Sequence, residues 1–186
     1  MKNAYLSEIL LTFDRMTGEY EKEIGPLNSE QLNWKPNAAS WSVGQCVDHV
    51  IITNKLYFII FDTLLNGTKP SNFWEKVPFL PGFFGSFLIK TTQPIINKKN
   101  KTLPVFEPSK SEIRDDIINT FFENQKVLID YMKRSDSVDH ENTIVTSPAT
   151  KIITYSLHDV CIILSGHEER HLNQARNVME LDGFPG

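Results

Sequence analysis

Apolar residues recur every three or four positions along four long stretches of the chain, which is the spacing of helices that bury one face. The first stretch covers residues 4–24 and ends at a Gly-Pro pair, which stops a helix. A short helical turn is expected at residues 28–32. The second long helix, over residues 42–66, begins with a capping box formed by Ser42 and Gln45.

The second half of the chain predicts two more long helices. Ser109 and Glu112 have the spacing of another capping box, so the third helix is expected over residues 109–134. Ser156 is the expected N-cap of the fourth helix, which extends to about residue 179.

Two connections interrupt this pattern. Residues 68–108 contain six prolines and many aromatic side chains. A connection this long and apolar is usually functional or packed against its domain. Three interpretations stay open: a lid that completes the core, a wall of a substrate pocket, or a dimer contact. Residues 135–154 are polar and then β-branched, which predicts a connector with a short extended stretch.

Four long helices, without an internal repeat or an alternation of strands and helices, predict an all-α fold. We expect a single domain over residues 1–186, built as an antiparallel four-helix bundle. The long aromatic-rich connection then joins the second and third helices, as a crossover or as an insertion.

Composition excludes several classes of protein. The chain has a net charge of −4 and one short basic cluster (Lys98, Lys99 and Lys101), so no nucleic-acid partner is expected. Both cysteines fall among apolar residues of predicted helices, which predicts buried thiols and no disulfide. The N-terminus does not resemble a signal peptide, and the longest apolar run, residues 79–89, is too short to span a membrane. We therefore expect a cytoplasmic protein with no membrane partner.

Two histidines interrupt the apolar stripe of the fourth helix. The stripe consists of Leu157, Val160, Leu164, His167, His171, Gln174 and Val178. His167 and His171 are four residues apart, so their imidazoles lie one above the other and can converge on one ion. Burying two imidazoles costs free energy unless their nitrogens find partners. A metal ion would supply these partners, and so would hydrogen bonds to other side chains.

A third ligand is needed, and His49 in the second helix is the candidate, because a bundle can bring facing core positions together. A lone histidine at such a position is more often a hydrogen-bonded core residue. The other histidines, His140 and His158, are expected to be solvated. Glu168 and Glu169 fall off the stripe and are expected to face away from the metal.

Two motifs resemble one known family. The stretch from Trp41 to His49, WSVGQCVDH, resembles the W-S-x-x-(E/Q)-x-x-x-H segment of the DinB/YfiT-like superfamily. The later pattern His167-x-x-x-His171-x-x-Gln174 is similar to the H-x-x-x-H-x-x-Q of that family's last helix. The order and spacing of the elements match over most of the chain.

The resemblance implies a four-helix bundle with a divalent metal, usually zinc or nickel, on His49, His167 and His171. Many relatives are dimers, which implies a homodimer. Activities in the family include thiol-dependent transferase and isomerase reactions, so a low-molecular-weight thiol is an implied cofactor. Many other members are described as metal-dependent hydrolases. Residues 73–89 look longer than the family's usual connection, which leaves the substrate open.

Three neutral imidazoles leave an open coordination position on zinc. A water there becomes more acidic and a thiol is deprotonated, so either is a candidate nucleophile, and no side chain is assigned as catalytic. Gln45, Asp48 and Gln174 are candidates to orient the imidazoles. Helix capping explains Gln45 equally well, and solvation explains Asp48.

Two functions stay open. The first is a metal-dependent transferase or hydrolase that acts on a small-molecule substrate. The alternative is a non-catalytic metal-containing bundle that binds a small ligand or a protein partner. An open coordination position beside a cavity favours the enzyme, whereas an ion enclosed by protein ligands favours the alternative.

Overall fold

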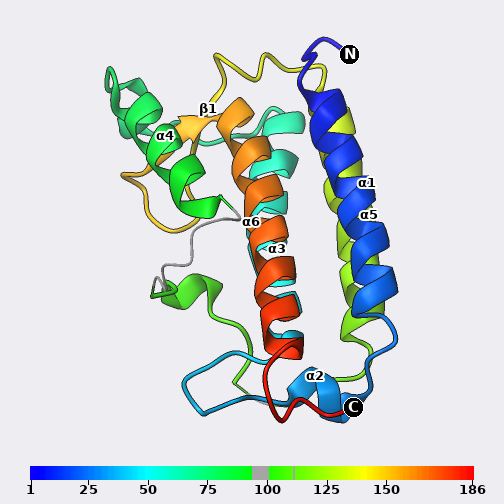
Figure 1. Ribbon diagram of the computed structural model, residues 1–186. Helices are drawn as coiled ribbons and strands as arrows, with labels where there is room; N and C mark the ends of the chain where they lie inside the picture. Colours follow the sequence, from blue (N-terminus) through cyan, green and yellow to red (C-terminus); the bar gives the residue numbers. More distant parts are fainter. Residues whose placement is uncertain (94–100, 111) are drawn as a thin grey trace.

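The computed structural model describes residues 1–93, 101–110 and 112–186, and the protein is mostly helical, as expected. Four long helices run side by side in Figure 1: α1 (Leu6–Glu23), α3 (Val43–Leu65), α5 (Ile117–Ser135) and α6 (Leu157–Met179). The colours along the chain show that α1 and α6 run one way and that α3 and α5 run the other way. Because α3 and α5 are parallel, the connection between them returns along the length of the molecule.

Predicted capping boxes define the starts of two long helices. The Ser42 hydroxyl accepts a hydrogen bond from the Gln45 N–H at 3.1 Å at the start of α3. The Ser156 hydroxyl accepts from the Asp159 N–H at 3.0 Å at the start of α6. The short helix α2 (Ser29–Asn33) also begins with a capping box. Local sequence determines these starts because each box satisfies backbone N–H groups that the helix leaves unpaired.

The predicted start of the third long helix is wrong. α5 begins at Ile117, and the expected capping box of Ser109 and Glu112 does not start it. The backbone at Ser109 instead bonds to side chains of α3. Its N–H donates to Asp48 Oδ2 at 2.7 Å, and its carbonyl accepts from Gln45 Nε2 at 2.7 Å. These tertiary contacts occupy the backbone groups that a helix would need.

The aromatic-rich connection contains a helix that the sequence did not predict. Its elements are η1 (Phe73–Lys76), α4 (Leu80–Thr92) and η2 (Pro104–Phe106). Pro81 is compatible with α4 because it lies in the first turn, where a missing N–H costs nothing. Gly85 allows α4 to pack closely on α6, since a Cβ there would overlap the Asp159 carboxylate. None of the described helices is long and apolar enough to cross a membrane.

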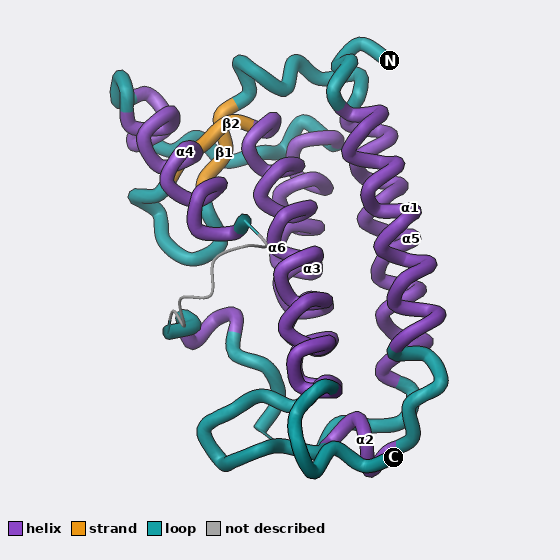
Figure 2. Tube along the Cα trace, viewed as in Figure 1, coloured by secondary structure: helices purple, strands orange, loops and turns teal. Residues whose placement is uncertain are grey.

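The connector before α6 forms a small hairpin. β1 (Ile144–Thr146) and β2 (Thr154–Ser156) pair antiparallel, with Val145 opposite Tyr155. Figure 2 shows both strands beside α4. The Tyr155 hydroxyl lies 2.7 Å from the Tyr57 hydroxyl in the interior, which ties the hairpin to α3.

Buried apolar side chains form two clusters along the helices. One cluster, near the start of α6, includes Phe13, Phe61, Leu128 and Leu164. The other, near the end of α6, includes Tyr20, Val47, Phe121 and Leu172. Between the two clusters, α3, α5 and α6 contribute buried polar residues that we call the polar layer: Thr53, Asn54, Asn124, Gln125 and Glu168.

Gly44 is expected to be essential for packing at the start of α3. A Cβ there would lie 2.9 Å from the Leu32 carbonyl oxygen and 2.9 Å from Ile113 Cγ2. The Gly44→Ala variant should lose about 1–3 kcal/mol of unfolding free energy in urea titrations, because the α2 backbone must move. Gly18→Ala is the matched control, since Gly18 lies in α1 and a Cβ there would meet nothing within 4 Å. Equal stability of the two variants would contradict the proposed contact.

Candidate metal centre

α3 and α6 bring three imidazoles together. One nitrogen from each of His49, His167 and His171 lies within 4.8 Å of the other two. His49 Nε2 and His167 Nε2 are 3.0 Å apart, and the ring centroids of His167 and His171 are 4.5 Å apart. The structure thus gathers the three predicted ligands at one point, and metal binding by them stays a prediction.

A backbone carbonyl from the aromatic-rich connection orients His49. His49 Nδ1 lies 2.5 Å from the Phe106 carbonyl oxygen in η2. Since a carbonyl can only accept, we assign the proton to Nδ1. The lone pair of Nε2 then points toward His167, which is the arrangement that metal-bound histidines commonly use.

Trp41 covers one side of the cluster. Its ring lies 4.9 Å from the His49 ring and 5.8 Å from the His171 ring, with an angle of 29° to the latter. Trp41 directly precedes the N-cap Ser42, so the capping box that starts α3 also positions this indole. The sequence presented Trp41 only as part of a motif, and nothing in its spacing indicated contact with two imidazoles.

The environment keeps the imidazoles neutral. His49 and His171 are buried, whereas His167 is partly exposed. Burial lowers the pKa of His49 to about 4, although the Phe106 carbonyl and Asp48 act in the opposite direction. Burial, followed by neighbouring imidazoles and Arg170, holds the pKa of His167 and His171 well below the usual range. Neutral imidazole is the form that binds a metal ion.

The donor set fits a divalent transition metal. Imidazole nitrogens suit zinc and nickel, and three of them match the ligand count of a zinc site with an open position. His171 Nδ1 is buried and has no hydrogen-bond partner among the described residues. A buried ring nitrogen without a partner is costly, so the described residues satisfy this ring only in part.

The three residues expected to orient the imidazoles lie in different places. Gln45 caps α3 and holds the Ser109 carbonyl, so its capping role is confirmed. Asp48 is bonded to the Ser109 N–H, so the expectation of simple solvation is wrong. Gln174 is the one of the three whose side chain contacts a histidine of the cluster, and this contact acts to raise the pKa of His171.

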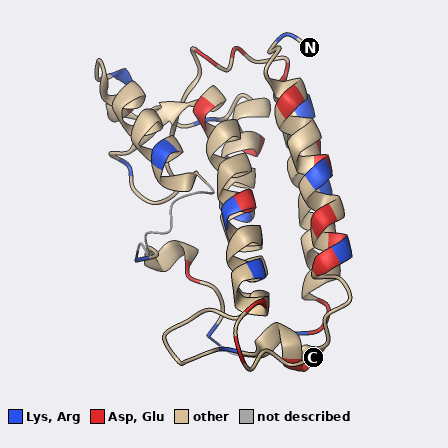
Figure 3. Ribbon diagram, in the orientation of Figure 1, with Lys and Arg blue, Asp and Glu red and all other residues tan. Residues whose placement is uncertain are grey.

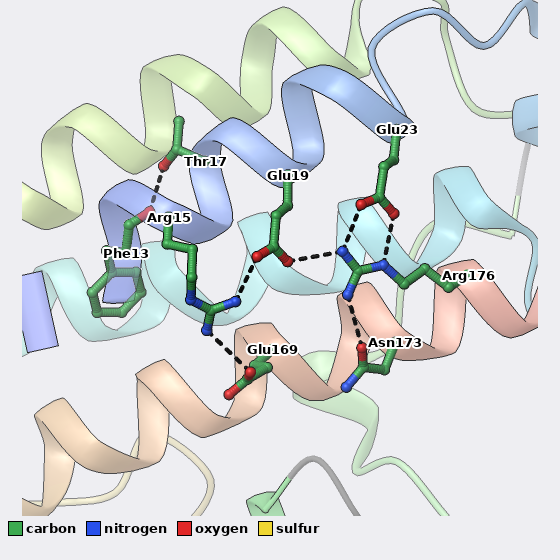
Figure 4. A network of polar contacts seen from close by, with 8 residues as sticks. All are labelled: Phe13, Arg15, Thr17, Glu19, Glu23, Glu169, Asn173 and Arg176. Carbon is green, nitrogen blue, oxygen red and sulfur yellow. Dashed lines mark hydrogen bonds and ion pairs between the residues drawn. The ribbon is translucent and has the colours of Figure 1, made fainter. Parts of the chain in front are cut away.

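Ion pairs with α1 set the rotation of α6. Arg176 contacts Glu19 at 2.8 Å and Glu23 at 2.6 Å, and Arg15 contacts Glu169 at 3.1 Å (Figure 4). Glu169 therefore faces α1, away from the metal centre, as expected. Because Glu169 and Arg176 lie on the side of α6 opposite His167, these contacts direct the histidine side toward α3.

Glu168 is buried, although the sequence predicted that it lies off the buried stripe of α6. It is 1% exposed, and its Oε1 accepts a hydrogen bond from Gln125 Nε2 of α5 at 2.5 Å. Burial raises the pKa of Glu168 to about 8. The most buried line of α6 runs through Leu164, Glu168 and Leu172, because α6 packs against both α1 and α3 and the side between them faces the interior. The histidines lie at the edge of that line.

Two polar residues on the buried side of α5 indicate in the sequence that a polar partner, here Glu168, is buried with them. Asn124 and Gln125 occupy the helical positions between Phe121 and Leu128, where apolar residues would continue the stripe. Four atoms of the polar layer have no hydrogen-bond partner among the described residues: Thr53 Oγ1, Asn124 Nδ2, Gln125 Oε1 and Glu168 Oε2.

One of the two remaining histidines is not solvated, contrary to expectation. His140 is fully buried, with Nδ1 2.5 Å from the Tyr5 hydroxyl and Nε2 2.9 Å from the Ser135 carbonyl oxygen. The reason is tertiary: the loop after α5 folds back onto the start of α1. His158 keeps partial exposure and lies 3.6 Å from a Glu141 carboxylate oxygen.

The end of α4 adjoins the metal centre on the α6 side. Arg170 Nη1 donates to the Thr91 carbonyl at 2.5 Å, and a Cβ at Gly166 would lie 3.3 Å from the Thr92 carbonyl oxygen. The connection therefore borders the cluster twice, here and at Phe106. Two shallow hollows lie elsewhere on the surface, one beside residues 112–116 and one beside Tyr5, and the three histidines line neither of them.

Acid should destabilise the metal-free protein through His49. The unfolded residue binds a proton below about pH 6.5, whereas the folded residue does so only near pH 4. Between these values the unfolded state binds more protons, so the free energy of unfolding falls as pH falls, by at most about 1.4 kcal/mol per pH unit for this residue. Urea titrations of chelator-treated protein at several pH values measure this slope.

His49→Gln is the matched control for this slope and should show a shallower one. Glu168, whose pKa is raised, contributes stability that is lost as pH rises toward 8. This opposite contribution is shared by both proteins and cancels in the comparison. Identical slopes would mean that the His49 imidazole is not shielded from water.

Comparison with known proteins agrees with this geometry. The family model for the DinB superfamily matches residues 12–175, which contain His49, His167 and His171. No curated protein and no solved structure matches the chain. Since the matched residues make up most of the chain, this protein belongs to the DinB superfamily.

Proposed function

We propose that this protein is a metal-dependent enzyme that holds a divalent ion on His49, His167 and His171. It acts on a small substrate, either by transferring a thiol to it or by hydrolysing it. The observation that carries this proposal is the convergence of three neutral imidazoles from two helices at one point. Membership of the DinB superfamily supports the same interpretation.

The residues around the cluster have distinct parts in this proposal. A bound ion would supply a Lewis acid that favours deprotonation of a water or thiol at its open position. The Phe106 carbonyl holds His49 in the tautomer that leaves Nε2 free to bind. Trp41 keeps water from one side of the imidazoles, and partly exposed His167 marks the side from which a substrate would approach.

The ligand count favours an enzyme over the alternative of a non-catalytic bundle. Structural zinc sites use four protein ligands, whereas catalytic sites use three and keep one position open. Among the described residues, the cluster contains three histidines and no further His, Cys, Asp or Glu within the same distance. Cys46 is buried and is not part of this group of ligand atoms.

Zinc or nickel is the metal that the family resemblance implies, and imidazole donors suit both. A low-molecular-weight thiol is the co-substrate for the transferase reaction. A homodimer and a cytoplasmic location stay predictions that follow from the family resemblance and the composition. The alternative function, a metal-containing bundle that binds a small ligand or protein without catalysis, is separated from the enzyme by the experiments below.

Metal content tests the ligand set. Protein purified without chelators or an affinity tag should contain close to one equivalent of divalent metal by elemental analysis. His49→Ala and His171→Ala should each lose most of it, since a remaining pair of imidazoles binds weakly. His158→Ala is the matched control, because His158 lies outside the cluster and is partly exposed. Equal metal content in all four proteins would rule out the proposed ligands.

Cobalt substitution tests the open position. A small thiol added to the cobalt-loaded protein should produce a thiolate-to-cobalt charge-transfer band in the near ultraviolet, because a thiol on the ion is deprotonated. The S-methylated thiol serves as control and should produce no such band. A spectrum that responds to azide but not to thiols would favour hydrolysis. A spectrum that responds to neither would favour the non-catalytic alternative.

A further inference from the structure

Four phenylalanines expose most of their rings on and beside α4. The exposed fractions of Phe73, Phe79, Phe83 and Phe87 are 72%, 92%, 65% and 55%. Phe83 and Phe87 are one turn apart, so they lie on the same side of α4, and Phe79 is the N-cap of this helix. We call these four residues the aromatic face. Figure 1 places α4 at the edge of the molecule, far from α1 and α5. Several exposed aromatic rings on one short segment are typical of an interaction site.

The packing of α4 holds this face outward. On the opposite side of the helix, a Cβ at Gly85 would overlap the Asp159 carboxylate, and Leu88 and Ile89 pack against the core. α4 therefore cannot rotate to bury its phenylalanines without losing these contacts. Phe79 adopts a left-handed backbone with φ of 64°, which is uncommon for a bulky residue and places an almost fully exposed ring at the tip of the helix.

The exposed charges near the aromatic face are positive. Lys76 and Lys90 are exposed, and α4 contains no Asp or Glu (Figure 3). The nearby Glu75 pairs with Lys69 at 2.6 Å and accepts a hydrogen bond from the Thr146 hydroxyl at 2.7 Å. This edge is thus basic although the whole chain has a net charge of −4. In the basic cluster noted from the sequence, Lys101 is exposed, and Lys98 and Lys99 lie outside the described residues.

We propose that the aromatic face docks this protein on an anionic phospholipid surface, with α4 lying parallel to the bilayer. Phenylalanine rings partition into the boundary between headgroups and acyl chains, and Lys76 and Lys90 reach anionic headgroups. α4 has 13 residues and is too short to cross the bilayer. The expectation that no membrane partner exists was based on the absence of a spanning segment, which a surface-lying helix does not need.

Charge favours a lipid surface over a second copy of the chain. A two-fold dimer formed through this face would place Lys76 and Lys90 of both copies in one interface. α4 offers no acidic residue to pair with them, so like charges would oppose the contact. Anionic headgroups neutralise both lysines. The proposal does not depend on the metal chemistry, so binding alone can test it.

Co-sedimentation of the full chain with lipid vesicles tests the proposal. Binding is expected to vesicles of equal phosphatidylglycerol and phosphatidylcholine, and much less binding to phosphatidylcholine alone. Phe83→Ser/Phe87→Ser should weaken binding by at least about tenfold, because two anchoring rings are lost. Lys76→Gln/Lys90→Gln should weaken it by about fivefold for each lysine.

Leu11→Ser is the matched control, since Leu11 is 68% exposed on α1, outside the aromatic face, and its variant should bind like the parent. Circular dichroism should show the same helix content in all the proteins, because every substituted side chain is exposed. Failure of the parent to bind anionic vesicles would overturn the proposal, as would equal losses in the Leu11 variant. A dimer that Phe83→Ser/Phe87→Ser dissociates, without vesicle binding, would assign the face to a second copy instead.

Discussion

Polar side chains are buried halfway along α3, α5 and α6, and their need for partners shapes the packing of the helices. The polar layer separates two apolar clusters, and a buried polar atom costs free energy unless it finds a partner. The partners come from other segments: Phe106 provides a carbonyl for His49, and Gln125 provides an amide for Glu168. These two hydrogen bonds tie η2 to α3 and α5 to α6 at defined positions.

The described part of the connection between α3 and α5 borders the three histidines at two places. Its η2 turn orients one imidazole, and the end of α4 lies against α6 beside another. Ser109, just beyond it, bonds to Gln45 and Asp48 in the same helix that carries His49. The connection thus forms part of the surroundings of the three histidines, and the side of α4 that carries Phe83 and Phe87 is left exposed.

Local signals were sufficient for much of the fold and for two of the candidate ligands, His167 and His171. The capping boxes at Ser42 and Ser156 place the starts of α3 and α6, because they involve residues only three positions apart. The spacing of His167 and His171 places both rings on one side of a helix for the same reason. Where the same local signal competed with distant partners, as at Ser109, the prediction failed, because contacts with α3 occupied the backbone.

The helical class, the starts of α3 and α6 and the pairing of His167 with His171 could all be predicted from the sequence, and the family resemblance added His49. The burial of Glu168, the contacts of His140 with Tyr5 and Ser135, and the packing of Trp41 on two imidazoles depend on tertiary contacts. The difference lies in how far apart along the chain the interacting residues are. Helix propensity, capping and side-chain periodicity depend on neighbours within a few residues, whereas the burial of a polar side chain depends on which distant segment supplies its partner.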